Sequence, residues 1–279
     1  MASHQFLDEA TEFCAERGWG EPSFVASGNF KSTFRVDAAG ELVALKLVDP
    51  HKISAERTER EIRALESCSH QHICRLAETG VHRFGGREMH FLVEEYLGGG
   101  TLTGRSRQYV GNDSKLRKLL GGLTSALTHL EPLNLVHRDI KPDNVMFRDE
   151  GDEPVLVDFG LVRVLGDTSL TGTWATQGPG TPLYSAPEQL HNDKHLIDGR
   201  ADQFSMALVL GELYFGKHPF DAGGSTRSIV ERMASRRLPA DWFISAVNGH
   251  FLEPTLKMLK SWPVGRYRSP EAVRTAFEF

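Results

Sequence analysis

The chain has 279 residues, enough for one or two domains or lobes with a large buried core. Its 40% apolar and 25% charged residues exclude wholesale disorder, and a net charge of −5 gives no sign of a nucleic-acid or anionic-membrane partner. Three cysteines do not make a disulfide framework, and no secretion signal or apolar run of spanning length is present. We therefore expect a globular protein in the cytoplasm.

The N-terminal part alternates between helix and short strands. Apolar residues at helical spacing predict a helix over residues 5–17, and Gly18 ends it. Turn residues then separate runs of strand character. These predicted strands cover residues 23–27, 32–36, 41–48 and 90–97, with a charged amphipathic helix over 54–67 between the last two.

The C-terminal part is mainly helical. Residues 98–100 are three glycines, which we interpret as the joint between a strand-rich small lobe and a helical large lobe. Leucines on one face predict a buried helix over 114–130, and an apolar run predicts a core helix over 201–215. Residues 161–181 are rich in Gly, Ser and Thr and predict a surface loop, whereas Ser269 and Pro270 begin a last helix.

Four motifs occur in a fixed order. Val43-Ala44-Leu45-Lys46 comes first, His137-Arg138-Asp139-Ile140-Lys141-Pro142-Asp143-Asn144 and Asp158-Phe159-Gly160 follow, and Ala186-Pro187-Glu188 comes last. In this order and spacing they resemble the eukaryotic-like (Hanks-type) serine/threonine protein kinase family. The resemblance implies an α+β, bilobal protein kinase fold. Residues 1–20 would be a helical extension, 21–97 the small lobe and 98–279 the hinge end and large lobe, with one kinase domain over about 22–279.

The motifs also carry the chemistry of phosphoryl transfer, which depends on positioning and charge neutralisation. Asp139 would accept the proton of the attacking hydroxyl, and Lys141 would steady the transferring phosphate. Lys46 would contact the α- and β-phosphates of ATP, with Glu61 as its anchor; Glu56 and Glu59 are competitors for that role. Asn144 and Asp158 offer oxygen ligands suited to Mg²⁺, with Mn²⁺ as an alternative ion.

The predicted nucleotide site departs from the family pattern in its glycine-rich loop. Only Gly28 remains of three glycines, and Ala26 and Lys31 stand at the outer positions, which would reduce the freedom of the backbone around phosphate. The charge of Lys31 could return affinity, although a solvated lysine is the simpler interpretation. The residues expected around ATP are Ala26, Gly28, Phe30, Thr33, Ala44, Lys46, Glu95, Leu97 and Met146.

The strand before the hinge contains a second departure. The resemblance puts Glu94 at the gatekeeper position, which is normally apolar or Thr. A glutamate buried there is costly unless it is paired, and Lys46 is the candidate partner. If Glu94 takes Lys46 from Glu61, the resting state would be inactive. A one-residue slip that turns Glu94 outward is the alternative.

Lys141 and Thr181 resemble serine/threonine kinases rather than tyrosine kinases, and the segment around Thr181 would form the acceptor platform for protein substrates. Arg138 implies a phosphate on the activation segment, which could form by autophosphorylation. The candidate sites are Thr168, Ser169, Thr171, Thr173 and Thr176. Asp202 would brace the catalytic loop, and Glu188 with Arg266 would form a buried ion pair.

Other interpretations stay open. A pseudokinase or partner-activated scaffold that binds nucleotide weakly would explain the loss of two loop glycines and the glutamate at the gatekeeper position. The full set of catalytic residues opposes this interpretation. A small-molecule phosphotransferase would lack the acceptor platform. The helix over 5–17 lies outside the family core and either packs on the small lobe or docks a regulatory partner. The cysteines and histidines of residues 68–74 fit no common zinc spacing, so we expect no metal there.

Overall fold

The computed structural model describes residues 5–27, 31–48, 66, 68–84, 87–149, 151–158 and 181–278. The chain divides into two units, one with its described residues within 5–98 and one within 99–278. Apart from Glu66, the helix predicted over 54–67 lies outside the described residues, as does the loop predicted over 161–181 apart from Thr181.

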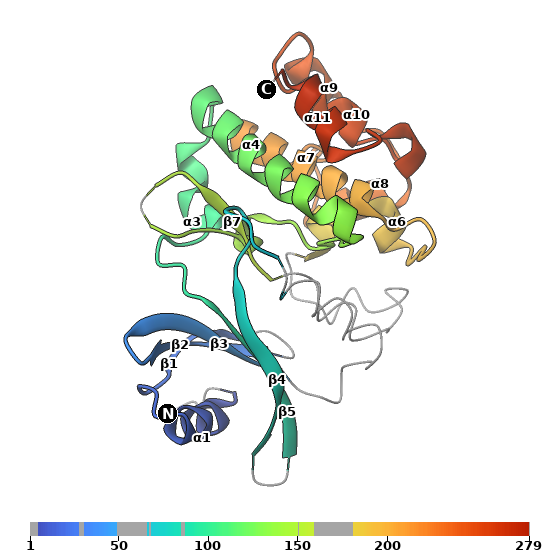
Figure 1. Cartoon of the computed structure of the whole chain (residues 1–279). Helices are drawn as coiled ribbons and strands as arrows, with labels where there is room; N and C mark the ends of the chain where they lie inside the picture. Colours follow the sequence, from blue (N-terminus) through green and yellow to red (C-terminus); the bar gives the residue numbers. More distant parts are fainter. Residues whose placement is uncertain are drawn as a thin grey trace. The chain divides into compact units, whose positions relative to one another are not determined.

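The first unit is an antiparallel sheet of five strands in the order β1-β2-β3-β5-β4 (Figure 1). The pairs β1–β2, β2–β3 and β4–β5 each join consecutive strands, whereas β3 pairs with β5, so β4 lies at the outer edge. The elements are α1 (Leu7–Glu16), β1 (Ser23–Ser27), β2 (Lys31–Ala38), β3 (Glu41–Val48), β4 (Leu76–Phe84) and β5 (Arg87–Glu95).

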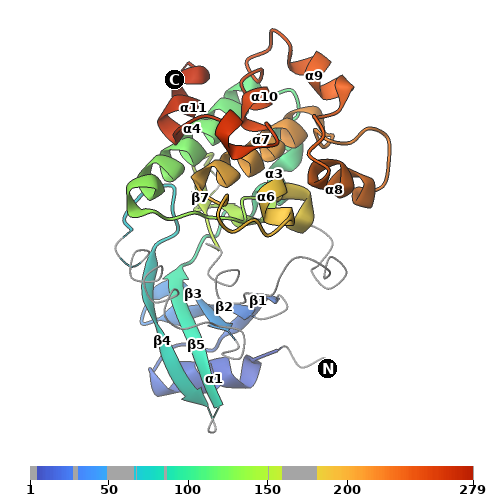
Figure 2. The ribbon, with the colours of Figure 1, turned by 90° about the vertical axis from the view of Figure 1, so that its right-hand side faces the viewer.

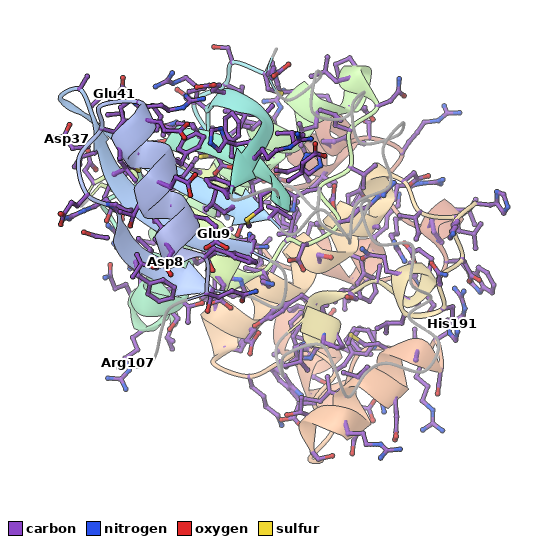
Figure 3. All side chains as sticks on the ribbon, turned by 90° about the horizontal axis from the view of Figure 1, so that it is seen from below. Asp8, Glu9, Asp37, Glu41, Arg107 and His191 are labelled. Atoms are coloured by element: carbon purple, nitrogen blue, oxygen red, sulfur yellow. The ribbon has the colours of Figure 1, made fainter. Side chains whose placement is uncertain are left out.

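Helix α1 covers one face of this sheet (Figure 2). Its buried residues Ala10, Phe13 and Cys14 follow the helical spacing, and the Phe13 ring lies 4.8 Å from the ring of Phe91 on β5. The guanidinium of Arg17 lies 4.2 Å from the centroid of the Phe13 ring. Figure 3 shows Asp8 and Glu9 at one end of the helix. The predicted N-terminal extension is therefore part of the core of the first unit.

The two faces of the sheet have different neighbours. Val43, Leu45 and Leu47 on β3 belong to the core cluster that contains α1, as do Met89, Phe91 and Val93 on β5. Successive side chains of a strand point to opposite faces. The intervening residues of both strands, Ala44, Lys46, Leu92 and Glu94, therefore project from the face opposite α1.

The second unit is mainly helical and contains one short hairpin. Helix α4 is buried along its leucine face, and α7 is buried on nearly all sides, as its apolar sequence predicts. The elements are α3 (Leu102–Arg105), η2 (Ser106–Gln108), α4 (Asp113–Leu130), η3 (Glu131–Leu133), η4 (Pro142–Asn144), β6 (Val145–Phe147), β7 (Pro154–Leu156), η5 (Thr181–Tyr184), α6 (Pro187–Leu190), α7 (Gly199–Phe215), α8 (Thr226–Ala234), α9 (Asp241–Val247), α10 (Thr255–Met258), η6 (Pro263–Gly265) and α11 (Pro270–Ala276).

The structure confirms the predicted fold class, with a five-stranded antiparallel sheet in the N-terminal part and helices in the C-terminal part. The sequence prediction missed β4, because its burial pattern has little alternation and its centre is Gly80. That glycine allows close packing: a Cβ atom there would lie 2.9 Å from the Phe91 ring. Within the described ranges, no helix has the length and apolar character needed to cross a membrane.

Candidate active site

The glycine-poor loop connects β1 and β2. Ala26 pairs with Thr33 across these two antiparallel strands, so both predicted nucleotide residues lie close to the hairpin connection. Gly28 and Phe30, also predicted to contact ATP, lie outside the described residues. Lys31 is the first residue of β2 and is half-buried.

Lys46 lies near the end of β3 and is 7% exposed. Its Nζ atom donates a hydrogen bond to Glu94 Oε2 on the adjacent strand β5, at 2.5 Å. Glu61, the expected anchor for Lys46, lies outside the described residues, as do its competitors Glu56 and Glu59.

The environment of Glu94 excludes the outward orientation that a one-residue slip would produce. Glu94 pairs with Ala44 in the β3–β5 register, and its side chain is 12% exposed beside Lys46. The Cys74 thiol lies 3.5 Å from the same carboxylate oxygen. Burial raises the pKa of the Cys74 thiol well above its ordinary value, and the negative charge of Glu94 adds to the effect. Cys74 is therefore a neutral thiol that donates a hydrogen bond to the Glu94 carboxylate.

The predicted adenine-binding residues of the first unit lie on the same sheet. Ala44 is half-buried on β3, and Leu97 is buried just after β5. Glu95 ends β5, and its backbone N–H donates to the carbonyl of Arg75 at 3.0 Å. Met146, the other predicted adenine neighbour, belongs to the second unit and pairs with Val155 in the β6–β7 hairpin.

Three polar side chains gather in the loop that leads into β6. Lys141 Nζ lies 2.9 Å from Asp139 Oδ2, and Asn144 Nδ2 donates to the same oxygen at 2.9 Å. Asn144 Nδ2 also donates to the backbone carbonyl of Asp139 at 2.8 Å. The ammonium and the amide fix the orientation of the Asp139 carboxylate, which is 18% exposed.

Helix α7 supports the backbone of this loop through hydrogen bonds. Asp202 on α7 accepts hydrogen bonds from the backbone N–H groups of His137 and Arg138, both at 2.8 Å. Arg138 has a φ of +65°, a strained conformation that such bonds can maintain. Burial raises the pKa of Asp202 to about 7, and the two N–H bonds oppose that rise. The predicted brace is therefore a buried carboxylate that sets the backbone just before Asp139.

His137 completes this support. It is fully buried, its Nε2 atom lies 3.0 Å from the Val157 carbonyl, and its Nδ1 atom accepts from the Asp139 N–H at 3.3 Å. An imidazole that donates at Nε2 and accepts at Nδ1 is neutral. Burial also lowers the pKa of His137, which favours the neutral ring. The side chain therefore links the Asp139 loop to the strand that precedes Asp158.

The two candidate metal ligands come together through the backbone. The N–H of Val157 donates to the carbonyl of Asn144 at 3.0 Å, so Asn144 and Asp158 lie at the same end of the β6–β7 hairpin. Asn144 uses its amide nitrogen toward Asp139, so its side-chain oxygen is the candidate metal-binding atom. An amide oxygen and a carboxylate form a donor set that fits Mg²⁺.

The segment that follows Thr181, where the acceptor platform was predicted, makes further supporting contacts, some of which sequence reasoning missed. Glu188 and Arg266 form the expected ion pair, with both side chains fully buried. Gln189 was not predicted, although it directly follows Glu188: its amide nitrogen donates to the Arg138 carbonyl at 2.8 Å. Thr181 begins η5, and the five candidate phosphorylation sites lie outside the described residues.

Tyr184 and Glu212 form another pair that the sequence did not reveal. The Tyr184 hydroxyl donates to Glu212 Oε2 at 2.6 Å, which ties η5 to α7. Both residues belong to stretches that look apolar in sequence, so only the three-dimensional structure shows the pairing. Burial raises the pKa of Glu212, and its hydrogen bond with Tyr184 opposes that rise.

Comparison with known proteins agrees with this geometry. The family model described as "Protein kinase domain" matches residues 22–274. The chain is 34% identical over 229 residues to the serine/threonine-protein kinase PknL of Mycobacterium tuberculosis, which covers 78% of this chain and 53% of PknL. It is 27% identical over 236 residues to the serine/threonine-protein kinase atg1 of Dictyostelium discoideum, and the match covers 82% of this chain and 34% of atg1. It is also 27% identical over 275 residues to the serine/threonine-protein kinase pkn3 of Myxococcus xanthus, and the match covers 92% of this chain and 48% of pkn3.

The chain therefore belongs to the protein kinase domain family. It spans about a third to a half of the length of these curated relatives.

Proposed function

We propose that this chain is a serine/threonine protein kinase, which transfers the γ-phosphate of ATP to serine or threonine hydroxyls of proteins. The observation that carries the proposal is the contact of Asp139 with both Lys141 and Asn144, in a loop fixed by Asp202. A catalytic base needs a fixed orientation and a neighbouring cation where negative charge develops. The serine/threonine kinases among its relatives support the class of acceptor.

The residues of the second unit have distinct roles in this reaction. Asp139 accepts the proton of the acceptor hydroxyl, and the Lys141 ammonium stabilises negative charge beside it. Asn144 and Asp158 hold the divalent ion, for which we propose Mg²⁺, with Mn²⁺ as an alternative. When bound, the nucleotide and its ion supply the phosphoryl group and neutralise part of its charge.

In the first unit, we propose Lys46 as the cation for the α- and β-phosphates, with Glu61 as an anchor. Ala26, Gly28, Phe30, Thr33 and Ala44 would surround the nucleotide, together with Glu95, Leu97 and Met146. The projection of Ala44 and Lys46 from the sheet face opposite α1 supports this assignment, because the α1 face is filled by the core.

The segment around Thr181 would form the acceptor platform. Regulation would involve the residues that precede it. We propose autophosphorylation within Thr168, Ser169, Thr171, Thr173 and Thr176, because Arg138 directly precedes the catalytic Asp139. A regulatory partner of α1 stays a prediction. The apolar face of α1 is already buried on the sheet, so such a partner would meet the acidic face that carries Asp8 and Glu12.

The test is phosphate transfer from labelled ATP with Mg²⁺ to the protein itself and to a generic protein substrate. Asp139→Asn should abolish the signal, whereas Asp152→Asn should keep it. Asp152 is a matched control because it lies in the β6–β7 connection of the same unit and pairs with Lys115 at 2.7 Å. Mass spectrometry should place autophosphorylation within residues 168–176.

A pseudokinase is the second candidate, and the engagement of Lys46 by Glu94 is the observation that favours it. That interpretation predicts no transfer by the wild-type protein, with weak or absent ATP binding. Transfer that is equal in the wild type and Asp139→Asn would instead point to a contaminating kinase and would remove the support for the proposed function.

A further inference from the structure

The sheet itself supplies a carboxylate for Lys46. On the face opposite α1, Lys46 of β3 lies directly across from Leu92, and Glu94 is two residues further along β5. Diagonal neighbours of this kind on adjacent strands lie about 7–8 Å apart at the backbone, within reach of two long side chains. The Lys46–Glu94 contact is therefore set by the register of two hydrogen-bonded strands.

The pair is nearly removed from water. The side chains of Lys46 and Glu94 are 9% and 12% exposed, and their charged atoms are 2.5 Å apart. The Cys74 thiol approaches the same oxygen of Glu94 at 3.5 Å. A buried charge without a partner costs several kcal/mol, and the contact between these two side chains reduces that cost for both. Glu94 consequently holds the end of the Lys46 side chain at this point of the sheet.

We propose that Glu94 is a positioning residue for phosphotransfer: it holds the Lys46 ammonium in place for the phosphates of ATP. This inference rests on the proposed kinase function. An ammonium has three N–H donors, so a hydrogen bond to Glu94 does not by itself prevent a contact with phosphate. Both residues belong to one sheet, so the contact does not depend on the placement of any other element.

The inference predicts that Lys46 has two acidic anchors, Glu94 from the sheet and Glu61 from the following segment. Loss of either one should leave Lys46 partly positioned, and loss of both should cost more than the two single effects combined. A role of Glu94 as a brake on Lys46 predicts the opposite, because its removal would then release the ammonium and raise the rate.

The experiment compares Glu94→Gln, Glu61→Gln and the double variant, with kcat and KM for ATP as readouts. Glu94→Gln should lower kcat/KM by about tenfold or more. Glu94→Asp, which restores the charge on a shorter side chain, should recover part of that loss. The control is Glu88→Gln, which removes a carboxylate of the same strand that pairs with Arg83 at the surface and should leave kcat/KM unchanged.

Two measurements separate positioning from folding. Thermal unfolding shows which variants are folded; if Glu94→Gln is not, Glu94→Thr replaces it as a smaller side chain without a carboxylate. The affinity for a fluorescent ATP analogue should fall in Glu94→Gln, and the loss in the double variant should exceed the product of the single losses. A structural role alone would not couple Glu94 to Glu61.

Unchanged or increased kcat/KM in a folded Glu94 variant would overturn the inference, as would strictly multiplicative losses in the double variant. Failure of the proposed function looks different: the wild type and Glu88→Gln would then transfer no phosphate. The affinity series would still test the Lys46–Glu94 contact in that case.

Discussion

Arg266 shows how a single buried residue supports the segment around Glu188. Its two terminal nitrogens bind both carboxylate oxygens of Glu188, at 2.5 and 2.8 Å. The same guanidinium donates to the carbonyls of Arg200 and Lys260, both at 2.9 Å. Because both side chains are fully buried, removal of one partner leaves an uncompensated charge in the core.

We therefore expect Arg266→Met to destabilise the second unit by about 3–5 kcal/mol. Glu188→Gln should have a similar effect, and the double variant should cost less than the sum because no lone charge remains. Urea unfolding followed by circular dichroism measures these differences. The control Arg227→Met breaks an exposed pair with Glu231 and should cost at most about 1 kcal/mol. Equal effects of the buried and exposed substitutions would contradict the argument.

The cluster of candidate catalytic residues could be predicted from sequence because each lies within a short motif whose chemistry is local. Asp139, Lys141 and Asn144 contact one another within a single loop, so their spacing already implied the cluster. Glu94 was predicted only as one of two alternatives, since its orientation depends on the register of β5 against β3. Gln189 and Tyr184 escaped prediction because their partners, Arg138 and Glu212, are distant in sequence.

At the scale of elements, α1 is the clearest addition to the family core, because the family match begins at residue 22. The helical spacing predicted it from sequence, but the sequence left packing and docking as alternatives. The structure shows the packing: Phe13 is fully buried against the sheet, and Arg17 binds Glu78 on β4 through two hydrogen bonds of 2.6 and 2.8 Å, whereas docking of a partner stays a prediction. Helix α1 is thus a structural part of the first unit.

Phe13→Ala should therefore destabilise the first unit by about 3–5 kcal/mol, the range for removal of a large buried aromatic ring. Thermal unfolding of the full chain, with Glu12→Ala on the exposed side of α1 as the control, measures the effect. If the two variants melt at the same temperature, the helix does not contribute to the core as the contacts indicate.

The connection after α7 carries a pH-sensitive contact with η5. His218 is buried, its Nε2 atom lies 3.0 Å from the Leu183 carbonyl, and its Nδ1 atom accepts from the Phe220 N–H. Burial lowers the pKa of His218 from 6.5 to about 4. In the folded state the ring therefore stays neutral at a pH where the unfolded chain already binds a proton.

The stability that His218 contributes is complete above pH 6.5 and is lost as the pH falls toward 4. The loss is on the order of 3 kcal/mol. We expect His218→Gln to unfold with a weaker pH dependence over this interval than the wild type. The exposed His195→Gln serves as the control, measured by urea unfolding at a series of pH values. Parallel pH profiles for the wild type and His218→Gln would contradict the assignment.

At the scale of the whole molecule, each of the two units buries apolar residues of its own. The core of the first unit combines α1 with β2, β3, β4 and β5, whereas leucines of α4 and the apolar residues of α7 are buried in the second. Units with their own cores generally fold as separate cooperative steps. The division of the chain near residue 98 thus predicts how it unfolds as well as how it is built.

We expect denaturant unfolding of the full chain to show two transitions, so that a single two-state free energy does not describe it. Phe13→Ala should move only the transition of the first unit, and Arg266→Met only that of the second, because the substituted side chains are buried in different units. The two transitions can be assigned by hydrogen exchange, which reports on each backbone amide separately. One transition that moves as a whole in both variants would instead show that the two cores unfold as a single cooperative unit.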